Sequence, residues 1–520
     1  MNSAPKYPVG IQSFSKLIEE GYIYVDKTGF IAPLVRDGGY YFLSRPRRFG
    51  KSLLLSTLQA YFEGRRELFR GLAIDLADLD WTPSPVLHFD LNAGLYDSPV
   101  GLEERLSATL THYENEYGIM WSGSNVSTRF ETLIRKAYEL TSRKVVILVD
   151  EYDKPLLGIE ENPVLFERNQ SLLKGFFSNL KSMDQYIRFA FMTGVARFNK
   201  VSVFSDLNNL DDISLSNRYA DICGWTEAEL VNNFRQGLEV LASEREEDPA
   251  TTLKMLRDFY DGYLFAPKGS RLYNPFSVLL ALRSREIEPY WFETGTPTFL
   301  ARRVKSSGMD PASINGQICT KEDLMAVGIG MDNSVPLMFK TGYLTIGSYD
   351  PVSGLYELRF PNREVEVGFS KFLLPMYAPA VSSSGSQFGF SLFRRDLYAG
   401  HPDEFMSRLA TLLKDLPGED HRESTYRAIV YLLCVLSGTD AHAERHGYKG
   451  RSDLEVSTPG YVYVFEFKYN RNVAEAMSQI IDRDYAGRYG MDGRSVYLIG
   501  ANFTDNGPDR GLSYEIEQLR

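Results

Sequence analysis

Four short apolar segments, each bounded by turn-forming residues and followed by a longer helical pattern, dominate the first 220 residues of this chain. They are YYFLS (residues 40–44), PVLHFDL (residues 85–91), KVVILVD (residues 144–150) and IRFAFMTG (residues 187–194). Three of the four have apolar side chains on both faces, as the buried strands of a parallel sheet do. Strands that alternate with helical patterns predict an α/β fold with a parallel sheet and crossover helices.

A helical region follows the last of these segments. TEAEL (residues 226–230) places a threonine three residues before a glutamate, the capping-box pattern that begins a helix. The helical pattern continues to about residue 340. A hairpin pattern and a further helix come next, an order that fits either a winged-helix-like unit or a hairpin that braces the preceding helices.

Length and composition set the number of domains and the class of protein. The chain has 520 residues, enough for three or four domains. VSSSGSQ (residues 381–387) has the small, polar composition of a linker. We therefore expect one α/β domain at residues 1–222, a helical and winged-helix-like region at residues 223–380, and a last α/β domain at residues 388–520.

Charge, cysteine content and hydropathy exclude several classes of protein. There are 57 Lys and Arg residues against 68 Asp and Glu, a net charge of -11, so nucleic-acid binding by bulk positive charge is excluded. The three cysteines lie far apart, which argues against a disulfide framework or a cysteine zinc site. The longest apolar run, residues 429–436, is too short to cross a bilayer. We expect a cytoplasmic protein without a membrane partner.

A glycine, a lysine and a serine stand between the first apolar segment and an amphipathic helical pattern, in SRPRRFGKSLLLSTLQAYF (residues 44–62). In a strand, loop and helix of this kind, backbone N–H groups face phosphate oxygens, Lys51 reaches the outer phosphates and Ser52 ligates Mg²⁺. The generic spacing GxxxxGK[ST] requires glycine where this chain has Arg45. That departure indicates a loop of altered curvature, with Arg45 and the two arginines after it adding positive charge beside the phosphates or towards another partner. The pattern therefore predicts a triphosphate site at Gly50, Lys51 and Ser52.

Two acids follow the third apolar segment, in VVILVDEYDKP (residues 145–155). An aspartate at the carboxyl end of a parallel strand binds Mg²⁺ through water, and the next glutamate polarises an attacking water, so we assign these roles to Asp150 and Glu151. The alternative is a strand that ends in solvated acids. The fourth segment ends near Thr193, where such folds place a polar residue that senses the terminal phosphate.

Two arginines beyond the fourth segment, Arg197 and Arg218, are candidate arginine fingers. Exposed arginines are more often only solvated or salt-bridged. An arginine finger supplied in trans would require a homo-oligomer.

The strongest chemical pattern lies near the C-terminus, in GRSDLEVSTPGYVYVFEFK (residues 450–468). A Ser-Thr-Pro-Gly turn divides it into two strands. If Val456 pairs with Tyr461, then Asp453 pairs with Val464. Because side chains alternate along a strand, Asp453 then shares a face with the acid and the lysine at the end of the second strand.

That acid and lysine are Glu466 and Lys468. A diagonal separation of about 7 to 8 Å would let the carboxylates of Asp453 and Glu466 share one divalent ion. Oxygen ligands favour Mg²⁺ or Mn²⁺ over zinc. Such an ion promotes phosphodiester cleavage, while Lys468 positions the nucleophile or neutralises the phosphate. The alternative is a half-buried strand with an ion pair across it.

Many separated motifs, in order, resemble the bacterial AAA-ATPase-like family whose members carry a C-terminal nuclease of the PD-(D/E)XK superfamily. They are YPVGIQSFSKLIEEGYIYVDKT, FLSRPRRFGKSLL, DEYDKP, MTGVARFNKVSVFSDLNNLDDISL, YDGYLF, YNPFSVL, YWFETGT and LYELRFPNREV. The resemblance covers essentially the whole chain. It implies nucleotide and magnesium binding at Lys51, Ser52, Asp150 and Glu151, and the family's loop tolerates an arginine-rich sequence before GKS.

The same resemblance bears on the C-terminal pattern. The spacing D-x12-E-x-K is similar to the PD-(D/E)XK signature, with Ser452 where a loosely kept proline would stand. In such nucleases an acid on the preceding helix often adds a metal ligand, a role for Glu423, although a solvated first-turn glutamate fits equally well. Gln479, on the helix after the lysine strand, resembles the superfamily's additional polar residue at the catalytic site.

An ATPase joined to a nuclease implies that the nucleotide state controls when phosphodiester bonds are cut. The expected cofactors are ATP and Mg²⁺, with Mn²⁺ an alternative at the nuclease site. DNA is favoured over RNA by the superfamily's habits, and defence against foreign DNA follows by analogy. Two rivals remain: a nucleotide-switched interaction protein whose nuclease fold is a docking module, and an ATP-driven remodeller that grips nucleic acid without cleaving it.

Overall fold

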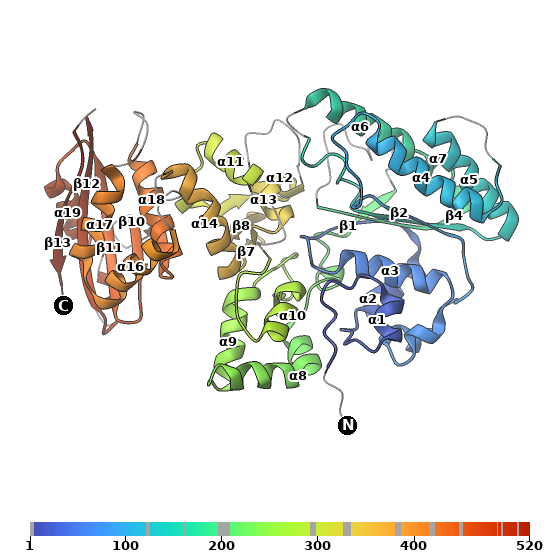
Figure 1. Ribbon diagram of the computed structural model, residues 1–520, viewed down its shortest axis with the longest axis horizontal. Helices are drawn as coiled ribbons and strands as arrows, with labels where there is room; N and C mark the ends of the chain where they lie inside the picture. The colour runs from blue at the N-terminus through green and yellow to red at the C-terminus, as the bar shows by residue number, and fades with distance from the viewer. Residues whose placement is uncertain are drawn as a thin grey trace. The chain divides into compact units, whose positions relative to one another are not determined.

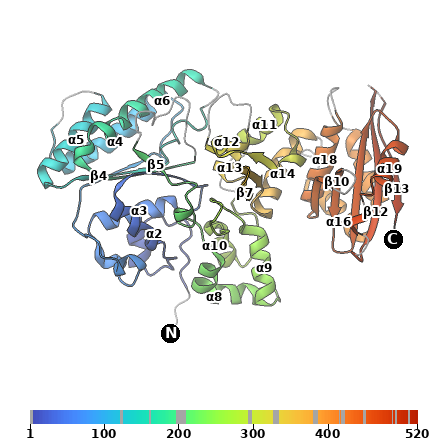
Figure 2. The ribbon, with the colours of Figure 1, turned by 180° about the vertical axis from the view of Figure 1, so that it is seen from behind.

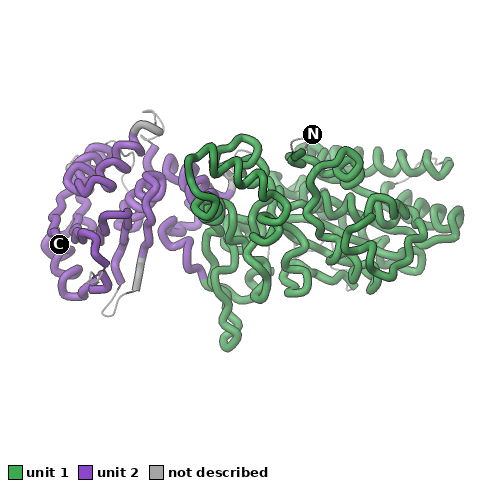
Figure 3. Tube along the Cα trace, turned by 90° about the horizontal axis from the view of Figure 1, so that it is seen from below, with its two compact units in different colours: residues 1–291, 318–362 green, residues 292–317, 363–520 purple. Residues whose placement is uncertain are grey.

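The computed structural model describes residues 5–120, 125–159, 162–195, 209–291, 298–325, 334–379, 386–414, 416, 422–446, 451–485, 487–489, 492–506 and 509–519. The chain divides into two compact units (Figure 3). The first comprises Met1–Trp291 and Ile318–Asn362, and the second comprises Phe292–Gln317 and Arg363–Arg520. The second unit therefore contains a segment that the sequence places between two parts of the first.

A five-stranded parallel sheet lies at the centre of the first unit, in the order β2-β3-β4-β1-β5. Its strands are β1 (Gly39–Ser44), β2 (Val86–Asp90), β3 (Val145–Asp150), β4 (Ile187–Gly194) and β5 (Leu210–Asp212). The four predicted strands and the parallel α/β class are confirmed. The three-residue edge strand β5 was not predicted, because LDD carries no apolar run.

Helices cover both faces of this sheet (Figures 1 and 2). One face carries α1 (Phe14–Glu19), α2 (Thr28–Asp37) and α3 (Lys51–Phe62), and the other carries α4 (Gly101–Glu116), α5 (Val126–Thr141), α6 (Pro163–Phe177) and α7 (Asn179–Ser182). Short 3-10 helices are η1 (Arg66–Phe69), η2 (Ala73–Leu76), η3 (Asp184–Tyr186) and η4 (Asn217–Tyr219). Because both faces are covered, all six residues of β3 are buried.

The rest of the first unit is mostly helical. It comprises α8 (Glu227–Glu244), α9 (Pro249–Tyr260), α10 (Pro275–Ser284), α12 (Lys321–Met325), α13 (Val335–Thr341), β7 (Thr345–Asp350) and β8 (Leu355–Arg359). The predicted capping box is present, since Thr226 and Glu229 each accept a hydrogen bond from the other's backbone. The predicted hairpin is β7 and β8, which form a three-stranded sheet with β6 (Gln317–Cys319). The helix after the hairpin, α14 (Arg363–Tyr377), belongs to the second unit.

The second unit is built on a five-stranded mixed sheet in the order β13-β12-β11-β10-β9, in which only β11 and β12 run parallel. Its strands are β9 (Asp440–His446), β10 (Arg451–Ser457), β11 (Tyr461–Tyr469), β12 (Ser495–Asn506) and β13 (Asp509–Gln518). Its helices are α11 (Thr298–Ser306), η6 (Pro311–Ser313), α14, α16 (Ser386–Ala399), α17 (Pro402–Lys414), α18 (Glu423–Leu436), α19 (Val473–Asp482) and η7 (Gly487–Tyr489). The predicted linker lies outside the described residues except for its last two, which begin α16.

Alternation along β11 separates the two helical layers of the second unit. Val462 and Val464 pack with Met477 and Ile480 of α19. The neighbouring Phe465 instead contacts Phe405 of α17, with ring centroids 6.2 Å apart. Polar residues at the end of β11 are therefore held at fixed positions by strand neighbours that are locked into the core.

No helix in the part of the chain that the structure describes is both long and apolar enough to cross a membrane. The three cysteines are buried as free thiols.

Candidate functional site

The loop after β1 has the backbone geometry of a phosphate-binding loop. Gly50 has φ +94° and immediately precedes α3, and no side chain caps this helix end. A positive φ is readily available only to glycine, which explains why Gly50 stands here. The first N–H groups of a helix lack intrahelical partners and attract anions. The exposed Gly50 and the half-buried Ser52 lie at this helix end, as the sequence predicts.

Lys51 is buried and holds the curve of this loop. Its Nζ donates to the carbonyl oxygens of Arg45 at 2.9 Å and Pro46 at 3.1 Å. Both acceptors belong to the loop itself, so the ammonium lies inside the curve of the backbone. A phosphate that entered the loop would meet this ammonium and the N-terminus of α3 together.

The prediction that Arg45 adds positive charge beside the phosphates is wrong. Arg45 is 1% exposed, and its guanidinium donates to the carbonyl oxygens of Ser44, Ser214, Tyr219 and Ala220 at 2.8 to 3.2 Å. It also lies 4.3 Å from the centre of a phenylalanine ring. Burial lowers the pKa of Arg45 to about 10. Arginine therefore replaces the generic glycine because its long side chain ties the loop to the segment after β5.

The two following arginines differ from Arg45. Arg48 is exposed, has φ +69°, and stacks its guanidinium 4.8 Å from the ring centre of Phe276. Arg47 is half-buried, and its carbonyl accepts a hydrogen bond of 3.2 Å from the indole nitrogen of Trp291. Trp291 is the last residue of the first unit before the chain enters the second. The loop is thus bonded to the residue at which the chain leaves the unit.

The acids after β3 are joined to the end of β4 by one hydroxyl group. Thr193 donates to Oδ1 of Asp150 at 2.5 Å and accepts from the backbone N–H of Glu151 at 3.1 Å. Thr193 is fully buried and Asp150 is 4% exposed. In this arrangement Thr193 orients Asp150 rather than facing solvent. It would report on a terminal phosphate only through that carboxylate.

Glu151 is half-buried and has φ +49°, in the left-handed region that few non-glycine residues adopt. Strain of this kind concentrates at functional positions. Because β4 lies between β1 and β3, the ends of β1 and β3 are two strand spacings apart, about 10 Å. The phosphate loop and the acid pair therefore lie at the same edge of the sheet.

The candidate arginine fingers gain no support. Arg218 is exposed, and its Nη1 lies 3.1 Å from Oδ2 of Asp37, which is the ordinary surface ion pair. Arg197 lies outside the described residues. The identity of any arginine finger stays a prediction.

The C-terminal hairpin forms as predicted, but its register differs. Val456 pairs with Tyr463 rather than Tyr461, and the last pair is Leu454 with Phe465. Continuing that register by one residue sets Asp453 opposite Glu466, where we expected it opposite Val464. The difference arises because residues 458–461 form a four-residue turn in which Thr458 and Tyr461 bond to each other. A shift of two residues keeps every side chain on its predicted face, so the shared face survives.

Three predicted residues come together where β10 and β11 part. Asp453 Oδ2 accepts the backbone N–H of Phe467 at 2.8 Å, which ties its carboxylate to the neighbouring strand. Lys468 Nζ donates to Glu466 Oε1 at 2.9 Å and to the Phe467 carbonyl at 3.1 Å. Glu466 is 2% exposed. Two carboxylates and one ammonium thus meet at the end of one hairpin.

The electrostatics of Glu466 fit a bound cation. Its Oε2 atom is buried and has no hydrogen-bond partner among the residues that the structure describes. Burial, and after it the charge of Asp453, raises the pKa of Glu466 to about 7. A buried carboxylate with one unsatisfied oxygen and a second carboxylate nearby is destabilised when ionised. A hard divalent cation would remove both penalties, and oxygen donors are the ligands such cations prefer.

Glu423 lies near this pair. It is the first residue of α18 and is half-buried. Burial raises the pKa of Glu423, and the charge of Asp453 raises it further. No set of three His, Cys, Asp or Glu side chains is arranged to hold a metal within the described residues. Asp453, Glu466 and Glu423 as metal ligands stay predictions.

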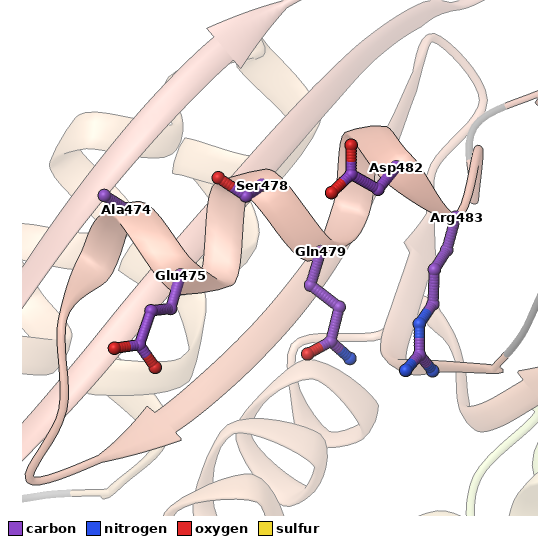
Figure 4. A pocket seen from close by; sticks show the side chains of 6 residues that line it. All are labelled: Ala474, Glu475, Ser478, Gln479, Asp482 and Arg483. Carbon is purple, nitrogen blue, oxygen red and sulfur yellow. The ribbon is translucent and has the colours of Figure 1, made fainter.

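Gln479 lies on α19, where it lines a surface pocket of about 470 Å³. Figure 4 shows Gln479, Glu475 and Arg483 leaving the same side of the helix. The Gln479 amide donates to Tyr485 Oη at 3.4 Å rather than to either acid. Its catalytic role stays a prediction.

Glu455 is a buried acid near this site that was not predicted from the sequence. It is 1% exposed, accepts from Ser452 Oγ at 2.8 Å and Tyr489 Oη at 2.5 Å, and lies 3.5 Å from Arg488. Its position two residues after Asp453, and so on the same face, is the signal that could have revealed it. Ser452, which stands where the signature has proline, here orients this buried acid.

Sequence comparisons agree with this division of sites. Residues 8–204 match the family model described as a predicted AAA-ATPase, and residues 421–508 match that of the PD-(D/E)XK nuclease superfamily. A protein of Azotobacter chroococcum mcd 1, described as an uncharacterized protein in the vnfD 5' region, is 37% identical over 513 residues. That alignment covers 96% of this chain and 97% of the relative. The similarity therefore includes both units.

Proposed function

This chain belongs to the predicted AAA-ATPase-like family and carries a PD-(D/E)XK nuclease superfamily domain, and from that premise we propose that it is a nucleotide-controlled, metal-dependent nuclease. The observation that carries the proposal is the hairpin end at which Asp453, Glu466 and Lys468 meet. Oε2 of Glu466 is buried there without a hydrogen-bond partner. A role as a metal ligand would explain why this oxygen is buried without a hydrogen bond.

Asp453 and Glu466 would hold the divalent ion, Mg²⁺ or Mn²⁺. When bound, the ion would stabilise negative charge on the phosphate and lower the pKa of a bound water. Asp453 is kept in place by the Phe467 N–H. Lys468 bonds Glu466. If Glu466 held a cation, the Lys468 ammonium would be available to donate to a phosphate oxygen.

In the first unit, Gly50, Lys51 and Ser52 would hold the phosphates of ATP, and Asp150 would hold its Mg²⁺. Lys51 would exchange its two carbonyl acceptors for phosphate oxygens. Glu151 would orient the attacking water, with Thr193 fixing both acids at the end of the sheet. If ATP is hydrolysed, the hydrolysis rate would limit how long the unit stays in its ATP-bound state. If ATP is only bound, its presence or absence would set the state of the unit.

We extend the proposal to DNA as the substrate and to defence against foreign DNA as the setting. One support is that nucleases of this superfamily usually act on DNA. The other is that the nuclease is paired with a nucleotide site, and the nucleotide would restrain cleavage. The net charge of -11 requires that the chain contact nucleic acid through a local surface or a metal.

Plasmid cleavage in Mg²⁺, with and without ATP, tests this function. We expect the wild type to cut and Glu466→Gln to lose at least a hundredfold in rate, because the isosteric amide removes one anionic metal ligand. Glu515→Gln is the matched control, since Glu515 is an exposed acid on β13 of the same unit. Equal cutting by Glu466→Gln and wild type would refute the nuclease. DNA-stimulated ATP hydrolysis without strand breaks would favour the remodeller.

A further inference from the structure

Arg427, on α18 one turn after Glu423, lies between two carboxylates. Its Nε and Nη2 donate to Oδ2 of Asp310 at 2.8 and 2.5 Å. Its Nη1 lies 3.7 Å from Oδ1 of Asp453. The guanidinium therefore makes short, charge-assisted hydrogen bonds to Asp310 and stands at ion-pair distance from the candidate metal ligand.

Asp310 is itself fixed. Its Oδ1 accepts the backbone N–H of Ala312 at 2.9 Å, which caps η6. The η6 helix packs against α18 and β9 within the second unit. Asp310 is 11% exposed and Arg427 is 16% exposed, so solvent screens this pair only weakly. A planar guanidinium held by two bonds to a fixed carboxylate has little freedom to turn.

The charges at the hairpin end make the position of the Arg427 guanidinium important for cation binding. Asp453, Glu466 and Glu423 supply three carboxylates, and the charges of Lys468, Arg427 and Arg471 act on Glu423. A guanidinium that moved fully onto Asp453 would neutralise a ligand that the divalent ion needs. As long as Asp310 holds the guanidinium, Arg427 attracts Asp453 without closing on it.

We propose that Asp310 is a positioning residue for Arg427, and that it holds the guanidinium back from Asp453 so that a divalent cation can bind between Asp453 and Glu466. This inference rests on the proposed metal-dependent function. Asp310 lies 117 residues before Arg427. It belongs to the segment 292–317, which is continuous in sequence with the first unit at both ends. Movement of that segment would therefore change the metal affinity of the nuclease site.

Mn²⁺ titration of the full chain, followed by the rise in its Tm, tests the proposal without relying on cleavage. We expect Asp310→Asn to raise the Mn²⁺ concentration at half-maximal stabilisation about tenfold, because the released guanidinium competes for Asp453. Arg427→Gln should have a midpoint at or below that of the wild type. In the double variant that combines Asp310→Asn with Arg427→Gln, the midpoint should no longer rise, because the guanidinium that competes for Asp453 is absent.

The matched control is Asp492→Asn. Asp492 accepts two bonds from Arg494 in the same unit, and Arg494 also donates to Thr458 in the turn at the far end of the hairpin. This variant should lower Tm without moving the Mn²⁺ midpoint. If Asp310→Asn does not fold, Arg427→Lys serves instead, since lysine keeps the charge but cannot make the paired bonds to Asp310. It should raise the midpoint as well.

Two outcomes would overturn the inference. One is an unchanged midpoint in both Asp310→Asn and Arg427→Lys, and the other is a shift by Asp310→Asn that persists in the Arg427→Gln background. Failure of the proposed function is distinguishable from both. In that case Mn²⁺ would not stabilise the wild type, or Glu466→Gln would be stabilised equally.

Discussion

At the residue scale, the hairpin end contains a buried carboxylate whose hydrogen bonds are incomplete. Glu466 has one oxygen bonded to Lys468 and the other buried without a partner. A protein tolerates such an atom where function requires it. Among the described residues no side chain bonds this second oxygen, and a bound cation is the simplest account of it.

The raised pKa of Glu466 predicts how stability depends on pH. Between the ordinary value of 4.5 and about 7, the folded chain holds a proton at this site that the unfolded chain has lost. Stability from this group is therefore complete below pH 4.5 and is lost as pH rises through 7. In EDTA, the free energy of unfolding of Glu466→Gln should gain on the wild type between pH 5 and 8.5, by on the order of 3 kcal/mol.

Urea titrations at several pH values measure this difference. The exposed variant Glu515→Gln serves as the control and should parallel the wild type. Parallel curves for Glu466→Gln and wild type would show that Glu466 ionises normally, which would remove the electrostatic reason for a metal.

At the scale of elements, the phosphate loop depends on one glycine. A Cβ added at Gly50 would meet no atom within 4 Å, so the cost of alanine comes from φ +94° alone. That strain is roughly 1–2 kcal/mol. If the loop relaxes to relieve it, the first N–H groups of α3 turn away from the phosphates. We expect Gly50→Ala to weaken ATP binding at least tenfold, as measured by calorimetry.

Gly71→Ala is the matched control for this variant. Gly71 has φ +79° and equally open surroundings, but it lies in a turn between η1 and η2. It should lose similar stability and bind ATP as the wild type does. Equal ATP affinity in all three proteins would contradict a phosphate-binding role for the loop.

The elements that could be predicted were those whose signal is local. Alternating and continuous apolar runs located the four main strands, and the Ser-Thr-Pro-Gly sequence at residues 457–460 located the hairpin. The register of that hairpin could not be predicted, because bonds within the turn decide it. Since the resulting shift is two residues, the face of Asp453 and Glu466 was right although their pairing was wrong.

Long-range partners could not be predicted. Arg45 was expected to add positive charge beside the phosphates or towards another partner, because only its neighbours in sequence were visible. Its acceptors Ser214, Tyr219 and Ala220 lie about 170 residues away. The pairing of Asp310 with Arg427 spans 117 residues and has no motif. Local patterns identify chemistry, whereas tertiary contacts decide which charges are already occupied.

At the scale of the whole molecule, Trp291 joins the proposed nucleotide-binding loop to the point at which the chain passes from the first unit into the second. Trp291 donates to the Arg47 carbonyl and is followed by the segment that carries Asp310. If the nucleotide controls cleavage through this segment, Trp291→Phe should bind ATP within about threefold of the wild type but lose most of the effect of ATP on cleavage, since phenylalanine cannot donate to the Arg47 carbonyl.

Cleavage rates across an ATP titration test this coupling. Trp81→Phe is the control, because Trp81 packs against Tyr61 and Phe69 of the same unit, away from the loop. A full ATP response in Trp291→Phe would place the coupling elsewhere. Loss of the response in both variants would point to a general effect on the fold.

The central claim is that two acids at the end of one hairpin hold a hard cation. Anomalous diffraction from crystals soaked in saturating Mn²⁺ tests it most directly. We predict a single strong peak within ligand distance of Asp453 and Glu466 that disappears in Glu466→Gln. An empty hairpin end at saturating Mn²⁺, with Glu466 still bonded only to Lys468, would contradict the account.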